Sequence, residues 1–109
     1  MLDAGIPLGL SSDIPYGPSD PWLAVSTARS RRTSNDRVVN PVERMTVSNG
    51  LARYLTRADN PGDRTRRVDV GSPADLCLLA TPLRHSLRDP ASTVVRLTIV
   101  AGKIVHTTE

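Results

Sequence analysis

The pattern of apolar and polar residues divides the chain into short elements separated by loops rich in proline and glycine. Residues 6–10 form a continuous apolar run of the length of one buried strand, bounded by Gly5 and by the polar pair Ser11-Ser12. No helix is expected before Asp20-Pro21. The run therefore predicts a strand that delivers Asp13 directly into a proline-rich loop, where a carboxylate is typical either of a functional site or of a turn that bonds its own backbone.

Two helices are expected after this loop. The first begins at Asp20, a residue that favours the N-cap position, with Pro21 in the first turn, and it is expected to run to about Arg32. The second begins after Thr46, and its apolar residues recur at helical spacing through Ala58. Its apolar face is expected to consist of Val47, Leu51, Tyr54, Leu55 and Ala58.

Two features weaken or end the second helix. Gly50 lies inside it and costs roughly 1 kcal/mol relative to alanine. Asn60-Pro61-Gly62-Asp63 is a strong turn sequence and is expected to follow the helix.

The last third of the chain changes to strand patterns. Residues 75–79 are a short, mostly apolar run, and residues 94–100 alternate between two faces. Ala101-Gly102 links the second of these to residues 103–106, which together predict a β-hairpin.

Composition indicates a modest core. Hydrophobic residues make up 39% of the 109 residues, but aromatic residues make up 3% and phenylalanine is absent. Cys77 is the only cysteine, which excludes an intramolecular disulfide and a structural thiolate zinc site. Because it lies in an apolar run, we expect it to be a small buried hydrophobic residue.

The net charge of +3 comes almost entirely from arginine, since Lys103 is the only lysine among 14 basic residues. The arginines cluster around residues 29–32 and again around residues 64–67, which first suggests nucleic acid. The runs are short, acids are interspersed and no nucleic-acid-binding motif accompanies them, so we expect solvated surfaces and no nucleic-acid partner. We also expect no signal peptide, no membrane association and a cytoplasmic location.

Several short motifs occur together in this chain. They are Ala4-Gly5, Pro7, Ser12-Asp13, Pro15, Pro18, Asp20-Pro21-Trp22, Arg31-Arg32-Thr33, residues 40–47, residues 71–76 and residues 95–106. In this order they resemble the end of the metal-dependent amidohydrolases, in particular the branch called amidohydrolase family 3. The resemblance extends over nearly the whole chain.

The resemblance implies an α/β fragment: the last strand and helices of a metal-dependent hydrolase TIM barrel, followed by the C-terminal strands of its small β-sandwich. Residues 1–60 would be the end of the barrel and residues 61–109 part of the sandwich. A complete barrel needs roughly 250 residues, and this chain has 109. We therefore expect a truncated reading frame or a misplaced start, with Met1 to Ala4 matching the tail of the helix before the last barrel strand.

The resemblance also implies a chemistry. Members of the family hydrolyse non-peptide carbon-nitrogen bonds with water activated by one or two divalent metal ions, usually zinc. By resemblance, Asp13 would be both a metal ligand and the catalytic base. The other ligands of the family, an HxH pair, a bridging residue and two later histidines, have no counterpart here. The two histidines of the chain, His85 in an expected loop and His106 on the last strand, are interpreted as surface or edge residues.

Three hypotheses follow. The chain is an inactive remnant of an amidohydrolase, a subunit that complements an N-terminal amidohydrolase half, or an unrelated non-catalytic binding module. The first two imply exposed strand edges and an uncovered apolar face, and hence self-association of the isolated chain. Bound metal is expected in the intact family fold and not in this chain alone.

Overall fold

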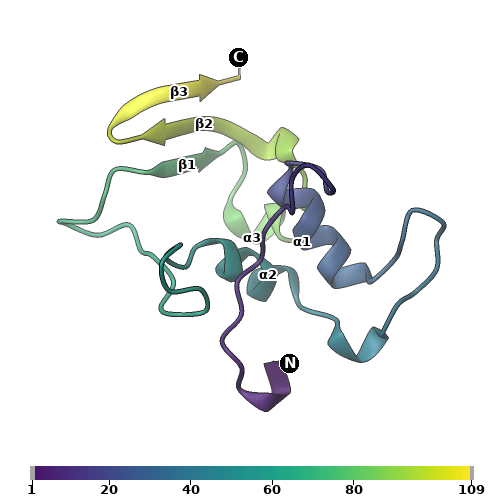
Figure 1. The fold of residues 1–109 in the computed structure, drawn as a ribbon. Coiled ribbons are helices and arrows are strands. Elements are labelled where there is room, and N and C mark those ends of the chain that lie inside the picture. Colours follow the sequence, from purple (N-terminus) through teal and green to yellow (C-terminus); the bar gives the residue numbers. More distant parts are fainter. Residues whose placement is uncertain (1, 109) are drawn as a thin grey trace. The chain divides into compact units, whose positions relative to one another are not determined.

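The computed structural model describes residues 2–108 of the chain. These fall into two compact units, residues 1–66 and residues 67–109, each of which is treated separately below. The first unit contains helices and turns, and the second contains a three-stranded antiparallel sheet with a short helix (Figure 1). The structure is thus a small α/β arrangement, as the sequence predicts in outline.

The first unit contains two α-helices and two 3₁₀ turns. They are η1 (Leu2–Ala4), α1 (Pro21–Ser30), η2 (Pro41–Glu43) and α2 (Val47–Tyr54). The second unit contains three strands, a short helix and a 3₁₀ turn. They are β1 (Leu76–Leu79), α3 (Leu83–Ser86), η3 (Ser92–Val94), β2 (Val95–Val100) and β3 (Lys103–Thr107).

Helix α1 begins where the sequence predicts. The Asp20 carboxylate accepts a hydrogen bond of 2.9 Å from the backbone N–H of Trp22, which satisfies one of the free donors of the first turn. The helix ends at Ser30, because Arg31 takes a left-handed conformation with φ of 56° and donates its N–H to Thr27 at 2.7 Å. The Arg31 side chain then donates to the Val39 carbonyl at 3.1 Å.

Helix α2 also begins as predicted but ends earlier. The Thr46 hydroxyl accepts a hydrogen bond of 3.1 Å from the N–H of Asn49, so Thr46 is the N-cap. The expected extension to Ala58 is wrong, because α2 ends at Tyr54. The Leu55 carbonyl accepts a hydrogen bond of 2.8 Å from the N–H of Arg66, and not from a residue of a continuing helix.

The buried apolar residues of the helices are few. They are Trp22 and Val25 of α1 and Val47 of α2, with 7%, 1% and 6% of their surface exposed. Helices α1 and α2 pack against each other, and at Gly50 a methyl group would lie only 3.1 Å from a methyl carbon of Val25. Gly50 therefore allows the close approach of the helices. This explains why a glycine lies inside α2 although it lowers the intrinsic stability of the helix.

The strand expected at residues 6–10 is not present. This segment has no regular secondary structure, and Ile6 at its start is 50% exposed. Its contacts are instead with a turn and a helix end: the N–H of Leu10 donates to Arg53 at 3.4 Å, and Gly9 lies close to Pro61. A strand needs a hydrogen-bonding neighbour, and within the described residues none lies beside this segment.

The sheet of the second unit has the order β1-β2-β3. Leu76 pairs with Ile99 between β1 and β2, and Val100 pairs with Lys103 between β2 and β3, so both pairings are antiparallel. The predicted hairpin is confirmed. Its turn, Ala101-Gly102, has φ of 48° and 78°, the left-handed values that a two-residue turn between antiparallel strands favours.

The loop expected around His85 is wrong. Residues 83–86 form the short helix α3, which Pro82 precedes as N-cap. The helix ends at Ser86, whose side chain is buried and whose hydroxyl lies 2.9 Å from that of Thr81. Among the described residues, no helix has both the length and the apolar character needed to cross a membrane.

Candidate active-site loop

Asp13 lies at a tight turn in the first unit. Its φ is 54°, a left-handed conformation that aspartate tolerates better than most residues. The Asp13 carbonyl accepts hydrogen bonds from the N–H groups of Tyr16 at 2.8 Å and Gly17 at 3.0 Å. The backbone of Asp13 therefore closes the turn, while the residue itself is exposed.

The turn depends on a glycine that the sequence did not single out. A Cβ atom at position 17 would collide with the backbone carbonyl oxygen of Ser12, so only glycine fits without moving the chain. The residues that the turn carries outward are strongly exposed, with Tyr16 at 90% and Ile14 at 63%. Large apolar and aromatic side chains at such exposure form a surface that another polypeptide or a ligand can cover.

The loop ends at Asp20, the N-cap of α1, whose charge acts on the half-buried Tyr54. Burial raises the pKa of Tyr54, and the negative charge of Asp20 raises it further. The Tyr54 hydroxyl and Nε of the neighbouring Arg53 are buried without a hydrogen-bond partner among the described residues. Native interiors contain few such groups.

The segment before Asp13 rests on the turn at residues 60–63. Asp63 N–H donates to the Asn60 carbonyl at 3.2 Å, which confirms the predicted turn. Gly62 has φ of 85°, and a Cβ atom there would collide with the backbone of Pro7 and Leu8. The turn thus supports the segment that leads to Asp13, although the two are distant in sequence.

The described residues do not by themselves fit a complete metal site. No group of three histidine, cysteine, aspartate or glutamate side chains gathers within residues 2–108. His85 on α3 and His106 on β3 are both exposed, as expected, and both belong to the second unit, whereas Asp13 belongs to the first. Catalytic zinc is usually held by three protein ligands, and Asp13 can supply one.

Cys77 differs from the expectation that it is buried. Its side chain is exposed on β1, an edge strand of the sheet. Neighbouring atoms still desolvate the thiol, and this raises its pKa. Burial failed as a prediction because neither face of this short sheet is fully covered in the described residues: Leu78, on the opposite face from Cys77, is 56% exposed, and every residue of β3 is exposed.

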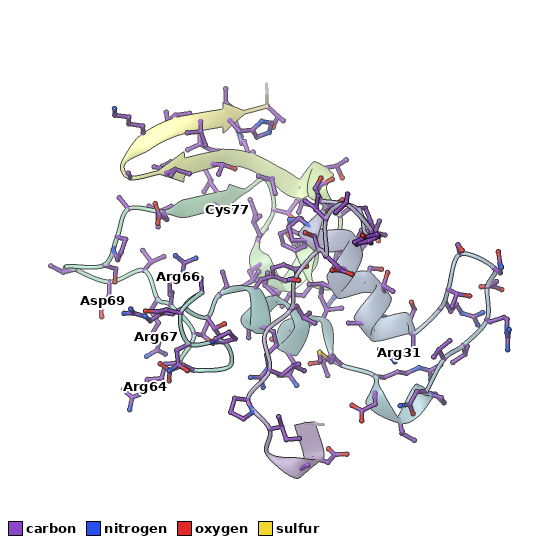
Figure 2. All side chains as sticks on the ribbon, in the orientation of Figure 1. Arg31, Arg64, Arg66, Arg67, Asp69 and Cys77 are labelled. Carbon is purple, nitrogen blue, oxygen red and sulfur yellow. The ribbon has the colours of Figure 1, made fainter. Side chains whose placement is uncertain are left out.

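The two arginine clusters occupy different parts of the chain (Figure 2). Arg31 lies at the end of α1, and Arg64 and Arg66 lie on the segment after α2. Two other arginines form exposed ion pairs: Arg32 with Asp36 at 2.8 Å, and Arg57 with Asp59 at 2.6 Å. The hydrogen bonds between Arg57 and Asp59 raise the pKa of the arginine and lower the pKa of the aspartate.

A hollow of about 700 Å³ at one end of α1 was not predicted. Besides Met45, three arginines and three hydroxyl side chains line it. They are Arg29, Arg32, Arg44, Ser26, Ser30 and Thr46. The signal in the sequence was the first arginine cluster, but Arg44 and Thr46 come from a segment whose return to α1 only the fold reveals.

Comparison with known proteins identifies the family of this chain. Residues 1–106 match the amidohydrolase family. The chain therefore belongs to the amidohydrolase family, and the resemblance carried by the sequence motifs is confirmed.

A curated relative supports this assignment. The chain is 32% identical over 82 residues to an N-substituted formamide deformylase of Arthrobacter pascens. The alignment covers 72% of this chain and 15% of the relative's length. No solved structure matches the chain.

Proposed function

We propose that this chain contributes Asp13 to the hydrolytic centre of an amidohydrolase that residues beyond these 109 complete. In this proposal residues 1–60 form the end of the catalytic TIM barrel and residues 61–109 part of the adjoining β-sandwich. The completing residues belong either to another part of the same protein or to a separate N-terminal half. The chain alone would then have no hydrolase activity.

The observation that carries the proposal is the placement of Asp13. It lies in an exposed turn directly after an apolar segment, residues 6–10, that has no strand partner among the described residues. The buried polar atoms without partners on Arg53 and Tyr54 lie on the helix end to which this segment bonds. An unpaired apolar segment and unsatisfied polar atoms side by side are what a barrel strand leaves when its neighbours are taken away.

The reaction we propose is hydrolysis of a non-peptide carbon-nitrogen bond. Water adds to the carbonyl carbon, the carbon-nitrogen bond breaks, and the products are a carboxylic acid and an amine. Asp13, as a carboxylate, accepts a proton from the attacking water and returns it to the departing nitrogen. The matched relative acts on N-substituted formamides by its name, and we propose a small carboxamide of that kind as the substrate class here.

A divalent metal ion, zinc in our proposal, would belong to the completed centre. When bound, it would polarise the carbonyl group and make water a better nucleophile. Membership of the family supports a metal-dependent reaction. From this chain only Asp13 is proposed as a ligand.

A chimera tests the proposal. Residues of this chain replace the matching segment of the Arthrobacter pascens deformylase, and hydrolysis of an N-substituted formamide is measured with and without added zinc. We expect the chimera to be active and Asp13→Asn to lower kcat by about 10²-fold to 10⁴-fold, because the amide cannot accept the proton.

Asp36→Asn is the matched control. Asp36 is also an exposed aspartate with a left-handed backbone, φ of 59°, in a loop of the same unit. Its exposed ion pair with Arg32 contributes little to stability, so this variant should keep full activity. An active chimera that is indifferent to Asp13→Asn would reduce Asp13 to a turn residue and refute the proposed role.

A further inference from the structure

The arginine-lined hollow of the first unit is built from two segments that the fold brings together. Ser26, Arg29 and Ser30 are spaced three and four residues apart and so lie on one face of α1. Arg44 and Thr46 lie just before α2. The backbone N–H of Met45, between them, donates to the Ala28 carbonyl at 3.2 Å, which fixes this segment against α1.

The polar groups of the hollow are mainly donors. Its lining contains three guanidinium groups and three hydroxyl groups and no carboxylate. Arg32 donates two hydrogen bonds to Asp36, one to its carboxylate at 2.8 Å and one to its backbone carbonyl at 3.1 Å. Both bonds use Nη1, so the guanidinium retains N–H donors on Nε and Nη2 for a further acceptor.

The chemistry of this lining suits a tetrahedral oxyanion. Guanidinium groups bind phosphate oxygens through two parallel hydrogen bonds. The Ser30 hydroxyl donates to the Thr27 carbonyl at 3.4 Å, so the hydroxyl groups of Ser26 and Thr46 are the ones proposed to donate to the remaining oxygens. The hollow also adjoins the start of α2, which begins after Thr46, and the dipole at a helix start favours negative charge. The volume of about 700 Å³ leaves room for a small group attached to the phosphate.

We propose that the hollow lined by Arg29, Arg32 and Arg44 is a binding site for the phosphate group of a small phosphorylated molecule. The site lies on the first unit and is independent of the hydrolytic role of Asp13. Because it is open to solvent, its affinity is set by charge and hydrogen bonding and decreases as the salt concentration rises.

Titration of the full chain with inorganic phosphate, followed by backbone amide NMR at constant ionic strength, tests the proposal. We expect saturable shifts confined to residues 26–32 and 44–48, with half-saturation on the order of 1 mM, since a five-atom ligand in an open site binds weakly. Phenyl phosphate in a second titration distinguishes an ester from the free anion: tighter binding of the ester supports a phosphorylated molecule. Acetate at the same ionic strength should cause no comparable shifts.

Two substitutions distinguish a specific phosphate site from general attraction of phosphate to a basic surface. Arg44→Gln should weaken phosphate binding about tenfold, because it removes charged donors from the hollow. Arg64→Gln removes the same charge from an exposed position outside the hollow and should leave the affinity unchanged. Circular dichroism of each variant shows whether the helices are retained.

Three results would overturn the proposal. Equal weakening by the two substitutions would mean unspecific attraction to a basic surface. Absence of saturable phosphate binding by the chain, whatever its degree of folding, would mean that the hollow is no site. Binding of an oligonucleotide with no response to phosphate or phenyl phosphate would assign the arginines to a nucleic-acid surface instead.

Discussion

The carboxylate of Asp75 accepts a hydrogen bond of 2.8 Å from the backbone N–H of Ala101, 26 residues further along the chain. Next to it, the N–H of Gly102 donates to the carbonyl of Ala74 at 3.0 Å. These two bonds join the start of β1 to the turn between β2 and β3. Two motifs that carried the family resemblance, residues 71–76 and residues 95–106, are thus linked by a structural role.

Replacement of Asp75 by alanine should destabilise the second unit. The carboxylate is an ionised acceptor at an exposed position, so its loss is expected to cost about 1 to 2 kcal/mol in the free energy of unfolding. Urea denaturation of the full chain measures the change. Asp69→Ala is the control, because among the described residues the Asp69 side chain accepts a hydrogen bond only from the adjacent N–H of Val70, at 2.8 Å. The effect of this control should be smaller.

Replacement of Ala101 by asparagine should stabilise the hairpin. Ala101 has φ of 48°, which costs an ordinary residue roughly 1 kcal/mol, and asparagine followed by glycine is favoured in such a turn. The expected gain is about 0.5 to 1 kcal/mol. Ala91→Asn, outside the turn at an extended residue, should give no gain. A lower unfolding free energy for the Ala101 variant would show that the turn is under no strain.

The sequence predicted the elements whose signals are local. The caps Asp20 and Thr46, the turn at residues 60–63 and the hairpin around Ala101-Gly102 each depend on residues close to one another. Such chemistry works over a few residues and does not require the rest of a fold.

The features that the sequence missed depend on distant neighbours. The apolar run at residues 6–10 has strand composition but no strand beside it, and Cys77 lies on an edge strand that leaves it exposed. The hollow around Arg44 arises because its segment bonds back to α1 through Met45. The sequence motif identified Asp13 as a candidate site residue. It did not predict the left-handed backbone of Asp13 or the close approach of Gly17 to Ser12.

Replacement of Gly50 by alanine should destabilise the helix pair, although alanine favours helices. The gain in helix propensity is roughly 1 kcal/mol. The added methyl would lie 3.1 Å from a methyl carbon of Val25, which is 1% exposed and has a stiff branched side chain. Overpacking of such a site costs about 1 to 3 kcal/mol, so we expect a net loss of up to about 2 kcal/mol, measured by chemical denaturation.

Two controls identify the cause of that loss. Ser48→Ala places alanine at an exposed position of the same helix and should be neutral or slightly stabilising. The double variant Gly50→Ala with Val25→Ala removes the crowded methyl groups, and a double-mutant cycle should then show favourable coupling between the two changes. Stabilisation by Gly50→Ala alone would show that α1 and α2 can separate without cost.

The raised pKa of Cys77 predicts slow alkylation at neutral pH despite exposure of the side chain. The thiolate is the reactive form, so iodoacetamide should react more slowly with the folded chain than with the chain in urea at the same pH. The folded state holds the proton more tightly. Stability is therefore unaffected below the unfolded pKa and decreases as pH rises from there toward the folded pKa. Cys77→Ser should lack this decrease, and equal alkylation rates in the two states would contradict the prediction.

Zinc binding by the isolated chain tests how much of a metal centre Asp13 provides. One carboxylate supplies one ligand, whereas catalytic zinc usually has three from protein, so we expect the chain to bind zinc no better than its Asp13→Ala variant in equilibrium dialysis. Weak binding that remains in both is expected to come from the exposed His85 and His106, and their joint replacement by alanine should remove it. Stoichiometric zinc that disappears with Asp13→Ala would mean that donors within these 109 residues gather around Asp13 when the metal is present. The centre would then be complete without another half, and hydrolysis by the chain alone would become the expected result.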